Sequence, residues 1–375
     1  MTARSVVAPI RFADRAGPAA LDRSPLRLMI VDDSAVARAV LSRMICAYDE
    51  FEVVALAANA GEALEGLAAH KVDIILLDVE MPGTSGIQAL PRILEAGDGA
   101  QVLIVSSNCE DGAEAAVTAL ALGAADTLPK PGTGNFMGRF AEVLAERLRR
   151  IGRAKREHDQ EGAGGGADAT LAAHLRPLPE HVPHCIALGA STGGLHALND
   201  FFAALPAFVQ APILITQHLP AVFMPYFARQ IEAASGRPTR VAYSGHRLKS
   251  GEVLIAPGDA HLGLRRRGNH VDVELLTQPA SCGCMPSVDT MLSSVADCYG
   301  ANGLAVVFSG MGRDGLVGGA ALVERGGGII VQNKHTCAVW GMPGAVALAG
   351  LASAILPPDQ IARCVAASAE GAPWK

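Results

Sequence analysis

Runs of apolar residues short enough to be strands recur along the chain, each followed by a turn and a stretch with helical spacing. This alternation constrains the fold, because β-α units in series form a parallel sheet with helices on both faces. The first half carries five such runs, and we therefore predict an α/β unit with a five-stranded parallel sheet. The runs lie at residues 26–31, 51–56, 72–77, 101–105 and 126–128.

The second half repeats the pattern over more residues. Buried-type strands are expected at 184–188, 211–217, 253–257, 304–308 and 328–332. We therefore predict a larger, doubly wound and mostly parallel α/β unit. Residues 262–266 and 271–276 alternate between apolar and polar side chains, which predicts an antiparallel hairpin at the edge of this sheet.

The stretch between the halves predicts a linker. A highly charged stretch at 152–161 is followed by a glycine-rich stretch at 162–166 and by prolines at 177, 179 and 183. Such a sequence is typical of a flexible connector. We expect an N-terminal extension at 1–24, a first domain at 25–150, a flexible linker at 151–183 and a second domain at 184–370.

Composition excludes some classes of function. The net charge is -6, so the chain lacks the basic footprint of a nucleic-acid-binding protein. No segment is long and apolar enough to predict membrane insertion. The eight cysteines are scattered, as in proteins of a reducing cytoplasm. Only Cys282 and Cys284 form a close pair, and the sequence shows no further metal ligands at a matching spacing.

Polar residues stand where the strands of the first half end. Asp32 and Asp33 follow the first strand, Asp78 the third, Ser106 the fourth and Lys130 the fifth. These strand ends share one edge of a parallel sheet. Three crowded carboxylates repel one another unless a cation neutralises them, and carboxylate oxygens suit Mg²⁺.

The first half resembles the receiver domain of response regulators, from about residue 26 to 151. The motifs that carry this resemblance are VDDS at 31–34, DVEMPG at 78–83 and the Lys130-Pro131 step. The resemblance implies a flavodoxin-like fold, phosphorylation of Asp78, and Mg²⁺ bound by Asp32, Asp33 and Asp78. It further implies that Ser106 and Lys130 contact the phosphoryl group and that a CheA-type histidine kinase donates it.

The second half carries a G-x-S-x-G turn at 189–193, between a predicted strand and a predicted helix. Such a turn can present Ser191 as a nucleophile, or it can be a structural or phosphate-binding glycine turn. His218 and Asp314 also follow predicted parallel strands, where they can converge with Ser191. The order Ser, His, Asp differs from that of the α/β-hydrolases.

This half resembles the methylesterase domain of the CheB family of chemoreceptor methylesterases, over about residues 184–369. The motifs are GASTGG at 189–194, QHLP at 217–220, PSVD at 286–289, GMGRDG at 310–315 and GMP at 341–343. The resemblance implies a catalytic triad of Ser191, His218 and Asp314, with the backbone N–H of Met311 as an oxyanion donor.

The implied reaction is phosphorylation-controlled hydrolysis of glutamyl methyl esters on methyl-accepting chemotaxis receptors, together with deamidation of receptor glutamines. It needs no cofactor for the ester chemistry, and we expect a cytoplasmic monomer. Two other classes stay open: a response regulator whose second half is a non-catalytic binding module, and a serine peptidase or general esterase. Replacing Ser191 by Ala separates the first of these from an enzyme.

Overall fold

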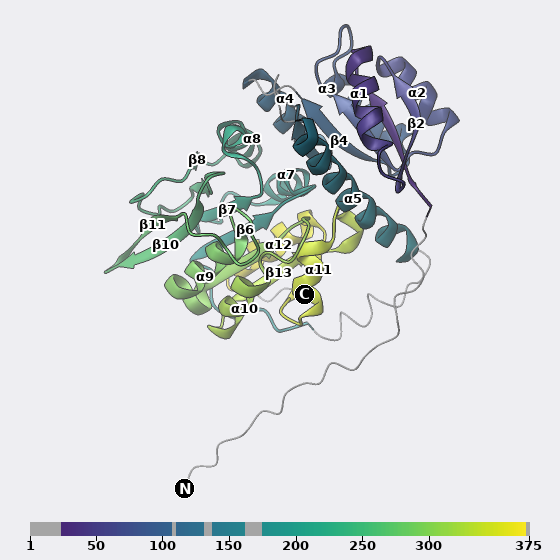
Figure 1. Cartoon of the computed structure of the whole chain (residues 1–375). Coiled ribbons are helices and arrows are strands. Elements are labelled where there is room, and N and C mark those ends of the chain that lie inside the picture. Colours follow the sequence, from purple (N-terminus) through teal and green to yellow (C-terminus); the bar gives the residue numbers. More distant parts are fainter. Residues whose placement is uncertain (1–23, 107–109, 131–136, 162–174, 373–375) are drawn as a thin grey trace.

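The computed structural model describes residues 24–106, 110–130, 137–161 and 175–372, which form two α/β units (Figure 1). The predicted extension at 1–24 lies, except for Ser24, outside the described residues, as do the linker glycines at 162–166. None of the helices in the described ranges is long and apolar enough to cross a membrane.

The first unit is a five-stranded parallel sheet in the order β2-β1-β3-β4-β5, which confirms the predicted fold. Its strands are β1 (Leu26–Val31), β2 (Phe51–Ala57), β3 (Ile74–Asp78), β4 (Gln101–Ser106) and β5 (Asp126–Pro129). Its helices are α1 (Ala35–Ile45), α2 (Ala60–Ala69), α3 (Gly86–Ala96), α4 (Glu110–Ala121) and α5 (Met137–Glu161).

Helix α5 is longer than the sequence predicted. Leu144, Leu148 and Ile151 repeat at helical spacing and are buried against the first sheet. Arg150 pairs with Glu146 one turn earlier, and such pairs support a helix. The charged residues that we expected to open the flexible linker therefore continue the helix as far as Glu161.

The second unit is a seven-stranded sheet in the order β14-β13-β12-β6-β7-β9-β8, and all its pairings are parallel. Its strands are β6 (Cys185–Ala190), β7 (Ile213–Gln217), β8 (Thr239–Val241), β9 (Val253–Ile255), β12 (Gly303–Val307), β13 (Gly328–Gln332) and β14 (Ala354–Leu356). The three-residue strand β14 was missed, because so short a run has no periodicity of its own.

Helices cover both faces of this sheet, as predicted. One face carries α7 (Gly194–Ala204), α8 (Met224–Ser235) and α12 (Pro358–Ala369), whereas the other carries α9 (Val288–Tyr299), α10 (Leu316–Glu324) and α11 (Gly341–Leu348). Short 3-10 turns lie at η1 (Ala221–Phe223), η2 (Gly300–Asn302) and η3 (Lys334–Thr336). The strand order reverses between β6 and β12, which opens a crevice at the carboxyl ends of these strands.

The predicted antiparallel hairpin is present as β10 (His261–Arg267) and β11 (His270–Leu276), but its predicted place at the sheet edge is wrong. The hairpin is a separate two-stranded sheet that packs against α9. Leu262, Leu264, Val271 and Val273 form its buried face and join the core around α9. Alternation fixes which face is apolar, but it does not say which element covers that face.

Candidate active site and receiver site

The carboxyl edge of the first sheet gathers the acidic residues that the sequence singled out. Asp32 and Asp78 are buried, at 1% and 3% exposure, and Lys130 Nζ lies 2.9 Å from Asp32 Oδ2 and 2.7 Å from Asp78 Oδ2. Asp33 is exposed, yet one oxygen from each of the three carboxylates lies within 4.8 Å of the others. Hard oxygen donors in this arrangement fit Mg²⁺, which takes a few carboxylates and keeps several waters.

Asp78 and Lys130, which form an ion pair at this edge, both have shifted pKa values. Burial raises the pKa of Asp78, repulsion from Asp32 adds to it, and Lys130 only partly offsets both. Burial alone would lower the pKa of Lys130, but its pairing with Asp78 and Asp32 outweighs that and raises it. Ser106 Oγ is buried and has no hydrogen-bond partner in the described part of the chain, so it can accept a new one.

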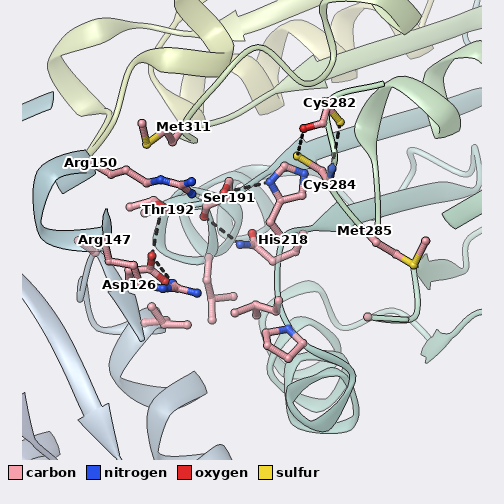
Figure 2. A pocket seen from close by; sticks show the side chains of 18 of the residues that line it. Asp126, Arg147, Arg150, Ser191, Thr192, His218, Cys282, Cys284, Met285 and Met311 are labelled. Carbon is pink, nitrogen blue, oxygen red and sulfur yellow. Dashed lines mark hydrogen bonds and ion pairs between the residues drawn. The ribbon is translucent and has the colours of Figure 1, made fainter. Parts of the chain in front are cut away.

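The crevice of the second sheet brings together three side chains from distant parts of the sequence. Figure 2 shows two of them, Ser191 and His218. Ser191 follows β6, His218 follows β7, and Asp314 lies between β12 and α10. His218 Nδ1 is 3.1 Å from Ser191 Oγ, and His218 Nε2 is 2.8 Å from Asp314 Oδ2. For Nδ1 to accept the serine proton, Nε2 must carry the ring proton and donate it to Asp314.

Two glycines make room for the serine turn. Gly193 has φ +72°, and a Cβ there would lie 2.4 Å from the Cβ of Ala338. A Cβ on Gly310 would lie 2.8 Å from the Cβ of Ser191 and 2.4 Å from Met342 Sδ. The loop after β12 therefore approaches the nucleophile turn more closely than any side chain at Gly310 would allow.

Sequence reasoning missed how Asp314 is held. Oδ1 accepts hydrogen bonds from Ser287 Oγ and from the backbone N–H of Asp289, both at 2.9 Å, and Oδ2 accepts one from the N–H of Val288 at 2.7 Å. These donors form the amino end of α9, where Ser287 is the N-cap and a negative charge is favoured. The PSVD motif was the available signal, but the sequence alone gave it no role.

These contacts set the ionisation of Asp314, which is 1% exposed. Burial alone would raise its pKa. The hydrogen bond and charge of His218, followed by the N–H groups of Asp289 and Val288, outweigh burial and lower the pKa to about 2. Asp314 is therefore a permanent anion at neutral pH.

Asp289 also fixes the loop that carries Asp314. Its Oδ1 accepts hydrogen bonds from the N–H of Gly315 at 2.9 Å and of Gly318 at 2.8 Å. Burial raises the pKa of Asp289, and the nearby charge of Asp314 adds to this, although the N–H donors oppose it. The two carboxylates thus clamp the start of α9 and the start of α10 to each other.

Met311 follows Gly310 on the same loop and lines the same cavity as Ser191. Among the described residues, its backbone N–H has no hydrogen-bond partner. The N–H groups of Ser191 and Gly310 are already bonded to Ser309 O and Val339 O. The N–H of Met311 is therefore available for a new hydrogen bond in this cavity.

Residues of the first α/β unit form one wall of this cavity, and Figure 2 shows three of them, Asp126, Arg147 and Arg150. The cavity has a volume of about 580 Å³. Helix α4 packs against α7, η1 and α8 (Figure 1). The N–H of Gly193 donates to Ala125 O at 2.8 Å, and Thr192 Oγ1 lies 3.5 Å from Asp126 Oδ2. The receiver residues in the wall are Leu120, Ala125, Asp126, Arg147 and Arg150.

A carboxylate and lysine cluster on one sheet, and a Ser-His-Asp arrangement at the switch point of another, define a response regulator joined to a serine hydrolase. Family models agree, since the response regulator receiver domain matches residues 28–137 and the CheB methylesterase matches residues 186–365. The chain belongs to the CheB family of protein-glutamate methylesterases/protein-glutamine glutaminases, given those matches and its curated relatives.

Three of these relatives are bacterial proteins of that name. Protein-glutamate methylesterase/protein-glutamine glutaminase 1 of Paramagnetospirillum magneticum is 38% identical over 90% of this chain and 94% of its own length. The protein of the same name in Rhodospirillum rubrum is 38% identical over 92% of this chain and 95% of its own length. Protein-glutamate methylesterase/protein-glutamine glutaminase 2 of Caulobacter vibrioides is 40% identical over 92% of this chain and 99% of its own length.

Proposed function

We propose that Ser191, His218 and Asp314 are the catalytic residues of a protein-glutamate methylesterase that also deamidates glutamine. The observation that carries this assignment is the relay from Ser191 Oγ through His218 to Asp314, with distances of 3.1 and 2.8 Å. An anion-binding turn would need neither the imidazole nor the buried carboxylate. The relay therefore favours an enzyme over a binding module.

The geometry supports a two-step acyl transfer. Ser191 Oγ attacks the carbonyl carbon of a glutamyl methyl ester while His218 Nδ1 takes its proton, and Asp314 stabilises the imidazolium. The Met311 N–H donates to the oxyanion, and such a donor contributes on the order of 3 kcal/mol. His218 then protonates the departing methoxide, methanol leaves, and water activated by His218 cleaves the acyl-enzyme. Ammonia leaves in the same way from a glutamine.

The receiver controls this reaction in the proposed function. Asp78 accepts the phosphoryl group from a CheA-type histidine kinase. Asp32, Asp33 and Asp78 would hold Mg²⁺, which would neutralise the carboxylates. Ser106 and Lys130 respond to the phosphoryl group, because one has an unpaired oxygen and the other gains a stronger anion as a partner. The proposed substrates are methyl-accepting chemotaxis receptors, and the proposed place of action is the cytoplasm.

The domain contact supports control by occlusion. The proposed receiver domain (25–150) lines the cavity that the proposed methylesterase domain (184–370) uses. Receiver residues beside Ser191 restrict access for a protein substrate, so phosphorylation at Asp78 would need to loosen the α4 contact with α7 and α8.

Methanol release from membranes that contain methylated receptors tests the proposed function. The full-length protein should release methanol faster with acetyl phosphate and Mg²⁺ than without them. Ser191→Ala should lose release by on the order of 10⁴-fold or more, because the variant lacks the hydroxyl from which His218 takes a proton. Asp78→Asn is the matched control for regulation, and it should keep the basal rate but lose the stimulation.

Other outcomes point elsewhere. Equal release by wild type and Ser191→Ala would exclude the triad. Stimulation that persists in Asp78→Asn would exclude this aspartate as the phosphoacceptor. Hydrolysis of simple esters or casein at rates similar to those on receptors would favour a general esterase or peptidase.

A further inference from the structure

A loop with two cysteines borders the proposed active site. Cys282 and Cys284 lie between β11 and α9 and line the same cavity as Ser191 and His218, and Figure 2 shows both cysteines beside His218. The sequence alone offered no further ligands for this pair. The fold supplies them, because a ligand atom of Cys284, one of His218 and one of Asp314 all lie within 4.8 Å of one another.

The local backbone folds the two thiols toward the same region. Gly283 has φ +72°, and this left-handed residue turns the chain back between the cysteines. Cys282 Sγ lies 3.4 Å from the N–H of Cys284 and 3.8 Å from Ser287 Oγ, and that hydroxyl donates to Asp314 at 2.9 Å. Cys284 Sγ lies 3.9 Å from Cys282 O. These sulfur contacts are long and weak, so both sulfurs can shift toward a ligand.

The types of ligand atom at this site determine which metal ion fits it. Two sulfurs, one imidazole nitrogen and one carboxylate oxygen match the tetrahedral preference of Zn²⁺, whose bonds of about 2.0 to 2.3 Å place ligand atoms roughly 3.5 Å apart. The ligand atoms of Cys284, His218 and Asp314 are separated by up to 4.8 Å, so these three need adjustments on the order of 1 Å. Mg²⁺ prefers oxygen ligands and suits the carboxylates of Asp32, Asp33 and Asp78 instead.

We propose that Cys284, His218 and Asp314, with Cys282 as the fourth ligand, form a Zn²⁺ site at which the ion reversibly inhibits the hydrolase. The inhibition rests on the proposed function of the triad, whereas the binding of the ion does not. The new site shares two residues with the triad, so an ion and a productive triad exclude each other.

The chemistry of inhibition follows from the two ring nitrogens of His218. An ion on Nε2 displaces the proton that this atom donates to Asp314, and the hydrogen bond of 2.8 Å between them is lost. If the ring stays neutral, its proton is now on the other nitrogen. Nδ1 can then no longer accept the proton of Ser191. The serine stays in place but has no base.

Binding also changes the thiols without oxidising them. Each coordinated sulfur forms a bond to Zn²⁺ and releases its proton to water, and no electron is transferred. Proton release on binding is therefore part of the proposal.

The first test measures binding without activity. Full-length protein in metal-free buffer with a phosphine reductant is titrated with Co²⁺ and then with Zn²⁺, in the Asp78→Asn background so that the receiver carboxylates contribute less. Wild-type cysteines should give a thiolate-to-cobalt charge-transfer band that one equivalent of Zn²⁺ abolishes. Cys284→Ser should lose the band and weaken Zn²⁺ binding by at least about tenfold, and Cys282→Ser should weaken it less. Absence of the band with both cysteines present would overturn the proposal.

The second test measures inhibition at free Zn²⁺ concentrations set by a chelator buffer. Methanol release should fall with Zn²⁺ and recover when chelator is added, and the midpoint for Cys284→Ser should lie at least about tenfold higher. Each variant is compared with its own metal-free rate. Equal midpoints would overturn the inhibitory site. A metal-free wild type without activity would instead contradict the proposed function, and the cobalt band alone would then decide whether the metal site exists.

Discussion

The two domains each bury an aspartate at the carboxyl edge of a parallel sheet, and they give it opposite properties. Asp78 is 3% exposed and its pKa is raised, whereas Asp314 is 1% exposed and its pKa is lowered to about 2. Burial opposes the charged form of both. The difference comes from what faces each carboxylate: Asp78 shares one lysine with Asp32, while Asp314 receives His218 and the amino end of α9.

The different hydrogen bonding of Asp78 and Asp314 suits the two carboxylates to different roles. Asp78 contacts Lys130 through one oxygen and receives only a long hydrogen bond, at 3.3 Å from the Glu80 N–H, on the other. Asp78 is therefore held weakly, which suits the role that we propose for it as a nucleophile toward a phosphoryl group. Asp314 accepts hydrogen bonds on both oxygens and lies within the fold, so it is suited to orient and stabilise an imidazole rather than to attack a substrate.

The largest expected effect is the loss of activity in Asp314→Asn. The amide side chain can present an N–H toward His218 and favour the wrong tautomer, so we expect kcat to fall by on the order of 10⁴-fold. Methanol release per phosphorylated enzyme measures it. Asp289→Asn provides a comparison, since Asp289 positions the loop without touching His218, and a smaller loss is expected. An equal loss in both variants would mean that the carboxylate of Asp314 acts only through the loop.

The comparison also predicts that Asp314→Asn and Asp78→Asn change the stability of the fold in opposite directions at pH 7 without Mg²⁺. An aspartate with a lowered pKa stabilises the fold above its unfolded value, so Asp314→Asn should lower the unfolding free energy by roughly 2 to 3 kcal/mol. This loss should persist at pH 4 and vanish only as the pH falls toward 2. An aspartate with a raised pKa destabilises the fold as the pH rises above about 4, so Asp78→Asn should raise the Tm at pH 7.

Thermal unfolding of the full-length variants at pH 7 and near pH 4 distinguishes the two environments. The gain in Asp78→Asn should shrink at the lower pH, while the loss in Asp314→Asn should remain. Adding Mg²⁺ at pH 7 should reduce the gain, because the ion offsets repulsion among the carboxylates. Tm shifts of the same sign at pH 7 in Asp78→Asn and Asp314→Asn would contradict the proposed difference between the two carboxylate environments.

The smallest effect concerns the contact between the two domains. Arg229 on α8 lies 3.2 Å from Glu114 on α4, and both side chains are more than half exposed. Glu114→Lys should replace attraction by repulsion and raise the unphosphorylated rate up to about fivefold, since an exposed pair contributes about 1 kcal/mol or less. The double variant with Arg229→Glu should restore the low rate. A rate that stays raised in the double variant would mean that the pair does not hold the domains together.

The sequence by itself determined the fold class and the residues that stand at the strand ends. Strand and helix periodicities are local, and the carboxyl ends of parallel strands must share one edge of the sheet. Asp32, Asp78 and Lys130 can therefore be grouped from their places at predicted strand ends. Ser191, His218 and Asp314 can be grouped for the same reason.

Only the tertiary structure decided the environments of these residues. The N–H groups that hold Asp314 belong to α9, and the wall beside Ser191 belongs to the receiver. The hairpin likewise lies on α9 instead of at a sheet edge. Cys284 meets His218 and Asp314 across gaps of 66 and 30 residues in the sequence. Such contacts depend on how complete helices and strands pack against one another, and no local pattern of residues determines that packing.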